Sequence, residues 1–184
     1  MLLLLLACIP ELHTVGGGGP WSAPENSWPS SPPPDGLLGQ GYDEGDVVME
    51  VRLPDQFGAE VSIWQFYGSV VAVDFSTMWC SPCQDLAAGV QATADAYAAE
   101  GFVYLTVLPQ DVEGEVPDTE DLNLWADSFG IQEPVLSDSL SVAEQAVPLQ
   151  NWPVVLVIGR DLKVKSRLDG PTEAVVHASI EAAL

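Results

Sequence analysis

The sequence predicts an α/β fold in which a central mixed sheet is flanked by helices. Residues 70–75 form an apolar run typical of a buried strand, residues 82–100 form an alanine-rich helical stretch, and residues 102–108 are again continuously apolar. Because a strand, a helix and a strand with short connections form a βαβ unit, these two strands pair in parallel. Residues 154–158 are apolar and residues 163–168 alternate, which predicts an antiparallel pair at the other side of the sheet.

Two short strands are expected in front of the central strand. Residues 47–53 alternate apolar with polar or charged side chains, and residues 60–66 predict a second strand. The turn Pro54–Gly58 separates them. The two strands therefore predict a hairpin before the sheet begins.

Local capping signals bound the remaining helices. Gly101 is a plausible C-cap for the first long helix. Asp118 can cap a helix that ends at Gly130, with acidic residues in its first turn where the helix dipole favours them. A short helix is expected over residues 140–146, and a last helix over residues 172–184.

Cys80 and Cys83 lie where the central strand meets the first long helix. Cys80 falls at the helix N-cap, where unpaired backbone N–H groups and the positive end of the dipole favour a thiolate over a thiol. Pro82 occupies an early helical position, where its missing N–H costs little. The thiolate is the nucleophile in disulfide exchange, and Cys83 is placed to attack a mixed disulfide formed at Cys80. The pair therefore indicates redox chemistry.

Zinc binding and a structural disulfide are the alternatives for this pair. Structural zinc needs four ligands, and beside this one Cys-x-x-Cys the chain has only His13 and His177, so we expect no metal. Two cysteines three residues apart close too small a loop to restrict the unfolded chain much, which argues against a purely structural bond.

The charge balance is strongly acidic. The chain of 184 residues carries 27 acidic and 5 basic side chains, a formal net charge of −22. Such a surface repels phosphate backbones and anionic lipid headgroups, so we expect no nucleic-acid partner and no direct membrane binding. We expect a monomer that acts on other proteins.

The N-terminus predicts an export leader over residues 1–8. Its apolar core has the length found in signal peptides and is far too short to span a membrane. The stretch that ends at Cys8 resembles the lipobox of bacterial lipoproteins, in which the cysteine is lipidated, although no Lys or Arg precedes it. A lipid anchor at Cys8 is the favoured interpretation; ordinary secretion and a chance apolar N-terminus are the others.

Residues 9–45 predict a flexible tether, because they are rich in Gly, Pro and Ser and cannot bury a core. Trp21 and Trp28 stand out in this range and could dock on the domain or touch a partner. The folded domain is expected over residues 46–184.

The stretch 73–83 resembles the active-site strand and turn of the thioredoxin superfamily, whose pattern is Val-Asp-Phe-Trp-Ala-x-Trp-Cys-Gly-Pro-Cys. Asp74 matches the buried aspartate of that family, Trp79 the flanking tryptophan, and Cys80 and Cys83 the redox pair. The resemblance implies a thioredoxin-like fold with a redox-active Cys80–Cys83 disulfide.

Two further features are similar to the extracytoplasmic redoxin or TlpA/ResA-like branch of that superfamily. One is the N-terminal hairpin. The other is the run over residues 129–138, which follows the pattern Phe-Gly-Ile…Pro-Val-Leu-x-Asp and marks a helix and strand inserted into the core. Pro153 matches the cis proline that faces the redox pair in this family; the alternative is a trans proline that only opens the strand. Trp152, in place of the usual Thr or Val, would offer its backbone to substrate. The resemblance thus implies catalytic roles for Cys80, Cys83, Asp74 and Pro153, and substrate contacts from Trp79, Ser81, Pro82 and Trp152.

The activity implied is thiol–disulfide exchange without a cofactor, most simply the reduction of protein disulfides outside the cytoplasm with an upstream electron donor. Asp74 would accept and return the Cys83 proton, or else only bind backbone or water. All five basic residues lie far in sequence from the pair, which predicts a modestly lowered Cys80 pKa and a reducing protein.

Two alternatives to a reductase stay open. One is a thiol oxidase or isomerase, and the other is a redox-inactive tethered binding module. A peroxidase is disfavoured because the Pro-x-x-x-Thr-x-x-Cys context of peroxiredoxins is not reproduced.

Overall fold

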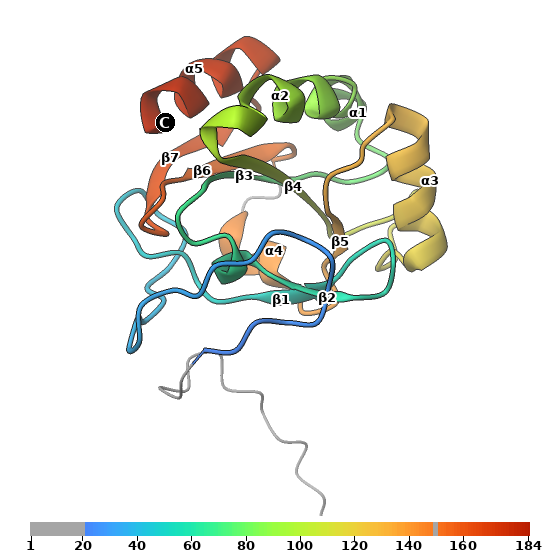
Figure 1. The fold of residues 1–184 in the computed structure, drawn as a ribbon. Coiled ribbons are helices and arrows are strands. Elements are labelled where there is room, and N and C mark those ends of the chain that lie inside the picture. Colours follow the sequence, from blue (N-terminus) through green and yellow to red (C-terminus); the bar gives the residue numbers. More distant parts are fainter. Residues whose placement is uncertain (1–20, 149–150) are drawn as a thin grey trace, which may run out of the picture.

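The computed structural model describes residues 21–148 and 151–184, and its centre is a five-stranded sheet in the order β5-β4-β3-β6-β7 (Figure 1). β3 pairs in parallel with β4, and β4 with β5, whereas β6 pairs antiparallel with both β3 and β7. The predicted mixed sheet is therefore confirmed. Its strands are β3 (Val70–Phe75), β4 (Phe102–Leu108), β5 (Val135–Ser137), β6 (Val154–Ile158) and β7 (Val164–Asp169).

Helices and a hairpin cover the two faces of this sheet (Figure 1). Side chains alternate along β3, so that Val71 and Val73 enter one apolar cluster while Val70 and Ala72 enter the other. The Val70 face packs on α1 (Ser81–Ala87), α2 (Val90–Tyr97), α3 (Thr119–Phe129) and α5 (Glu173–Ala183). The Val71 face packs on β1 (Arg52–Pro54), β2 (Glu60–Ser62), the 3₁₀ turn η1 (Ile63–Gln65) and α4 (Val142–Ala146).

The predicted capping residues act as expected. Asp118 accepts hydrogen bonds from the backbone of Glu120 and Asp121 at the beginning of α3, which forms a capping box. Gly130 ends α3 with φ 67°, in the left-handed region that favours glycine. Gly101 follows the 3₁₀ turn η2 (Ala98–Glu100) with φ 74° and leads into β4.

The single helix predicted from Pro82 to Glu100 is wrong in two respects, because it breaks at Gly89 and its last three residues form the 3₁₀ turn η2. α1 ends at Ala87 and α2 begins at Val90. A Cβ atom on Gly89 would lie 2.9 Å from the carboxylate of Glu173 on α5. The Glu173 carboxylate thus lies close to this position, and the break itself follows from glycine being a poor helix former.

The predicted hairpin forms, but its strands are shorter than expected. β1 begins at Arg52 rather than at residue 47, and β2 ends at Ser62 rather than at residue 66. The reason for the second difference is local: Ser62 and Gln65 form a reciprocal capping box that turns the chain into η1.

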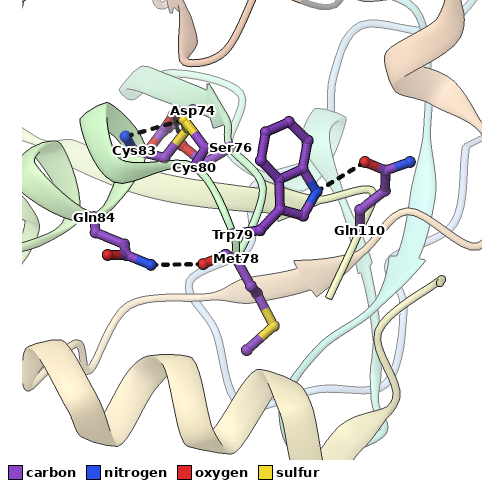
Figure 2. The surroundings of a disulfide bond; sticks show 8 residues. All are labelled: Asp74, Ser76, Met78, Trp79, Cys80, Cys83, Gln84 and Gln110. Carbon is purple, nitrogen blue, oxygen red and sulfur yellow. Dashed lines mark hydrogen bonds between the residues drawn. A yellow bond between two sulfur atoms is a disulfide. The ribbon is translucent and has the colours of Figure 1, made fainter. Parts of the chain in front are cut away.

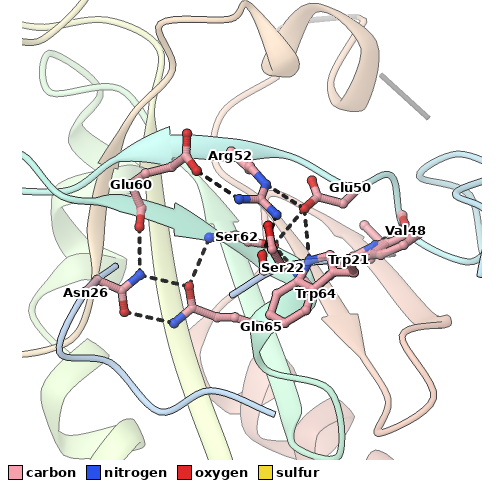
Figure 3. Close-up of polar contacts among 10 residues, drawn as sticks. All are labelled: Trp21, Ser22, Asn26, Val48, Glu50, Arg52, Glu60, Ser62, Trp64 and Gln65. Atoms are coloured by element: carbon pink, nitrogen blue, oxygen red, sulfur yellow. Dashed lines mark hydrogen bonds and ion pairs between the residues drawn. The ribbon is translucent and has the colours of Figure 1, made fainter. Parts of the chain in front are cut away.

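The tether predicted over residues 9–45 is wrong for its described part, residues 21–45, which packs against the domain (Figure 3). The Trp28 indole N–H donates to the Asp55 carboxylate at 2.7 Å. The Asn26 and Gln65 side-chain amides bond each other at 3.0 and 3.1 Å. Proline and glycine exclude regular elements here, but these side-chain partners hold the segment in an extended course.

Further contacts extend this docking to both ends of the segment. The Trp21 indole N–H donates to Glu50 at 3.2 Å, and the Arg52 guanidinium lies 5.9 Å from the Trp21 ring centre. Tyr42 is buried in the apolar cluster between the Val71 face of the sheet and the hairpin. The folded unit therefore includes residues that precede the predicted boundary at residue 46. Residues 1–20, with Cys8 and the proposed leader, lie outside the described part of the chain.

Within residues 21–148 and 151–184, no helix combines the length and the apolar character needed to cross a bilayer.

Candidate active site

Cys80 and Cys83 form a disulfide at the beginning of α1 (Figure 2). Their Cα atoms lie 5.2 Å apart, within the usual range for a disulfide. Cys80 is the N-cap residue, and its sulfur accepts a hydrogen bond from the backbone N–H of Cys83 at 3.3 Å. The helix end that the sequence predicted to stabilise a Cys80 thiolate is therefore in place.

The two sulfurs differ in access to solvent. Cys80 is 6% exposed and Cys83 is fully buried, so only Cys80 can be reached by a second molecule. Ser81 and Pro82 between them are exposed, as is Trp79. The order of events implied by the sequence, with Cys80 as the attacking and Cys83 as the resolving sulfur, fits this difference.

Asp74 lies fully buried on β3, on the face that packs against both cysteines. Its Oδ1 accepts a hydrogen bond from the Ser76 hydroxyl at 2.7 Å. Burial raises the pKa of Asp74 to about 7, and the Ser76 bond only partly offsets this. A carboxyl with that pKa can accept and return a proton near neutral pH.

Two buried hydroxyls share the Asp74 face of the sheet. Thr106 stands opposite Asp74 in the β3–β4 register, and Tyr104 lies two residues earlier on β4. Within the described part of the chain, neither hydroxyl nor Asp74 Oδ2 has a hydrogen-bond partner. Burial and the nearby Asp74 carboxylate raise the pKa of Tyr104 well above its usual value. Among the described residues, no cationic side chain acts on the pKa of Asp74 or Tyr104, so this layer is polar without a compensating positive charge.

Gln110 fixes the turn before Cys80, and sequence analysis missed it. Its side-chain oxygen accepts from the Trp79 indole N–H at 3.0 Å, and its backbone oxygen accepts from Met78 N–H at 3.0 Å (Figure 2). On the other side, the Gln84 amide donates to the Met78 carbonyl at 2.8 Å. A signal existed: β4 runs parallel to β3, so the residue just beyond β4 meets the residues just beyond β3.

Pro153 lies at the same end of the sheet as the disulfide. Val154 pairs with Phe75, the last residue of β3, so Pro153 stands level with the beginning of the 76–80 turn. The Trp152–Pro153 peptide bond is cis, as the resemblance implied. Trp152 is half-buried and packs against the apolar clusters of both sheet faces. The catalytic and substrate-binding roles of these two residues stay predictions.

No group of three or more His, Cys, Asp or Glu side chains is arranged to hold a metal ion in the ranges 21–148 and 151–184.

The sequence profile of the AhpC/TSA family matches residues 45–167, two thirds of the chain. The chain belongs to this family. Curated protein sequences contain no significant match. The peroxiredoxin motif Pro-x-x-x-Thr-x-x-Cys is matched only in part in this AhpC/TSA protein. Thr77 stands three residues before Cys80, as the motif requires, but position 73 holds Val instead of Pro.

Solved structures place this AhpC/TSA protein in the thioredoxin fold. A thiol:disulfide interchange protein DsbE from Chlorobium tepidum is 25% identical, with a TM-score of 0.66 over 78% of this chain and 99% of the other. The thioredoxin domain of a Bacteroides vulgatus thiol-disulfide oxidoreductase is 18% identical, with a TM-score of 0.65 over 76% and 96%.

A third neighbour is a secreted disulfide oxidoreductase from Mycobacterium tuberculosis. It is 13% identical, with a TM-score of 0.60 over 72% of this chain and 95% of the other. The expected superfamily and fold class are therefore confirmed.

Proposed function

We propose that the chain is a thiol–disulfide oxidoreductase that reduces protein disulfides through Cys80 and Cys83. The observation that carries this proposal is the disulfide at the beginning of α1, with one sulfur accessible and the other buried. The thiol–disulfide oxidoreductases among the structural neighbours support the reaction class.

The reaction begins with the reduced protein. The Cys80 thiolate attacks a substrate disulfide, forms a mixed disulfide and releases one substrate thiolate, which takes a proton from solvent. Cys83 then attacks the Cys80 sulfur, releases the second substrate thiolate and closes the Cys80–Cys83 bond. Two electrons pass from the protein to the substrate, and an upstream dithiol donor must return them.

Asp74 serves the second step in this proposal. Cys83 is buried and must lose a proton before it attacks, and the buried carboxylate of Asp74 is the acceptor on its side of the sheet. The pKa of about 7 lets the carboxyl return that proton when the donor reduces the pair again.

The positions of the basic residues support the reducing direction. Arg52 pairs with Glu50 and Glu60 on the hairpin, and Arg160 binds the carbonyls of Gly68 and Glu100 at the opposite end of the sheet. The other three, Lys163, Lys165 and Arg167, lie on or next to β7. A Cys80 thiolate that is stabilised by helix-end hydrogen bonds alone makes the dithiol a reductant rather than a strong oxidant.

A measured reduction potential and an insulin assay test this proposal together. We expect the pre-reduced protein to cleave insulin disulfides, with a potential near about −270 mV rather than about −120 mV. Cys80→Ser should abolish the activity. A reduction potential of about −120 mV would instead indicate a thiol oxidase. A protein that reduces no disulfide at all would instead be a redox-inactive binding module.

Trapping identifies the substrates. Cys83→Ser should accumulate mixed disulfides with other proteins, because the resolving sulfur is gone, whereas the Cys80→Ser/Cys83→Ser double variant should trap none. Peroxide consumption by the reduced wild-type protein at rates comparable with insulin reduction would instead favour a peroxidase, the activity that Thr77 leaves open.

We place this activity outside the cytoplasm. The secreted neighbour from Mycobacterium tuberculosis and the apolar run before Cys8 support export. Labelling with radioactive palmitate, with Cys8→Ser as the control, tests the lipid anchor.

A further inference from the structure

A groove of about 210 Å³ lies between the loop that follows β4 and helix α4, at the same end of the sheet as the disulfide. Two of its lining residues connect it to the redox pair. Gln110 holds the indole of Trp79, the neighbour of Cys80, and Trp152 immediately precedes Pro153 at the active end of the sheet. A chain segment that binds at Cys80 and passes over Trp79 would meet Gln110 at the edge of this groove.

The groove combines apolar lining with apolar side chains around it. Trp152, Pro109 and Val116 line it. Val116 is exposed, and the large side chains of Val112 and Leu140 near its two walls are also exposed. Exposed apolar side chains beside a reactive group are typical of a protein-binding surface.

A carboxylate stands on each wall. Glu115 lies on the loop wall and Glu144 on α4, and both side chains are exposed. Neither forms an ion pair with a described residue, and no Lys or Arg lines the groove. The third carboxylate, Asp138, is buried and accepts from the backbone N–H groups of Val142 and Ala143. Glu115 and Glu144 are therefore the charges free to meet a partner.

We infer that this groove selects disulfide-bearing segments with Lys or Arg near the reactive cysteine. The inference rests on the proposed function and names its substrate class. A basic segment would pair its cations with Glu115 and Glu144 while its apolar side chains cover Val116 and Trp152. A second copy of this chain is disfavoured as the occupant, because it would bring 27 acidic against 5 basic residues to the same negative surface.

Single-turnover kinetics with two synthetic peptides test the inference. The peptides share one internal disulfide and differ only in having two Lys or two Glu beside the cysteines. The pre-reduced full-length protein is mixed with each peptide, quenched with acid, and the released peptide thiols are quantified by chromatography. We expect reduction of the Lys peptide to be about tenfold faster at low salt, since each of two exposed ion pairs contributes modestly.

Glu115→Gln/Glu144→Gln should reduce this preference to about threefold or less, and so should about 1 M salt, where the Debye length is only about 3 Å. Glu25→Gln/Glu100→Gln is the matched control. It changes the net charge by the same amount at exposed positions that do not line the groove.

The outcomes separate the two proposals. Equal rates for the two peptides with wild type, or an equal loss of preference in both double variants, would overturn the groove as the selecting element while the oxidoreductase stands. Release of no thiol from either peptide by the pre-reduced wild type would overturn the proposed function, and with it this inference.

Discussion

Asp74 is the residue whose environment says most about mechanism. It is buried without a cation nearby, beside the hydroxyls of Tyr104 and Thr106, and its only hydrogen bond within the described part of the chain comes from Ser76. The free energy of ionising this carboxyl in the folded state therefore exceeds that in the unfolded state. A carboxylate kept here at a cost in stability fits a proton acceptor better than a structural residue.

Asp74→Asn should make the protein more stable above neutral pH. The pKa of Asp74 is about 7 when folded and 3.8 when unperturbed, so the unfolded state loses its proton first as pH rises. The wild-type protein therefore has its full free energy of unfolding from this group below about pH 4, where Asp74 is protonated in both states. It loses that contribution as pH rises from about 4 to about 7. We expect a gain of about 3 to 4 kcal/mol for Asp74→Asn at pH 8 and almost none at pH 4, measured by urea unfolding.

The same variant should resolve mixed disulfides more slowly. Loss of the proton acceptor should slow closure of the Cys80–Cys83 bond by about 100-fold at pH 8 and remove the rate inflection near pH 7. Thr106→Val is the control, because it removes a buried hydroxyl from the same layer and leaves the carboxyl. If Asp74→Asn left both the rate and its pH profile unchanged, Asp74 would be a structural residue only.

At the scale of elements, the segment 21–45 is part of the fold rather than a spacer. It lies along the hairpin formed by β1 and β2, on the face of the sheet opposite the disulfide (Figure 1). The buried carboxylate of Asp55 accepts from the Trp28 indole and also from the N–H groups of Phe57 and Ala59. One carboxylate thus joins the hairpin turn to the segment 21–45.

Trp28→Phe should lower the free energy of unfolding by about 1 to 2 kcal/mol, because it keeps a ring but removes a hydrogen bond to a charged group. Urea unfolding of the full chain measures the loss. Trp79→Phe is the matched control: its indole bonds a neutral amide at an exposed position, so we expect a change below about 1 kcal/mol. If the Trp28→Phe protein were as stable as wild type, the Trp28 contact would not stabilise the fold, and the interpretation of residues 21–45 as a tether would be favoured again.

At the scale of the whole molecule, repulsion among carboxylates outweighs pairing. The chain has 27 acidic residues and 5 basic ones, and the ion pairs Arg52–Glu50 and Lys165–Asp161 are partly exposed to solvent. Exposed pairs contribute little, whereas a large net charge destabilises the compact state through self-repulsion. The same field favours basic partners at the proposed groove between the loop after β4 and α4.

Added salt should therefore stabilise the protein. We expect the melting temperature to rise by at least about 3 °C between low salt and about 1 M NaCl, since screening weakens more repulsive than attractive contacts. Calorimetry in NaCl and in KCl at equal ionic strength measures the effect, and equal shifts would identify screening rather than specific ion binding. A melting temperature that falls with salt would contradict the argument.

The sequence alone determined the elements around the redox pair and the chemistry that they allow. Each helix end was predicted from residues only a few positions apart, so the sequence pattern alone identified it. These ends are the Cys80 and Asp118 N-caps and the glycines at 101 and 130. Asp74 was identified by resemblance, and its burial follows from an apolar strand covered on both faces.

Only the tertiary structure decided how distant segments meet. The turn before Cys80 depends on Gln110, and the docking of Trp28 depends on Asp55. The groove likewise exists because the loop after β4 faces α4 across the end of the sheet. The physical reason is shared: side-chain contacts between residues tens of positions apart leave no periodic or capping signal in either segment. Strand pairing indicates at most which segments meet, and packing decides which side chains touch.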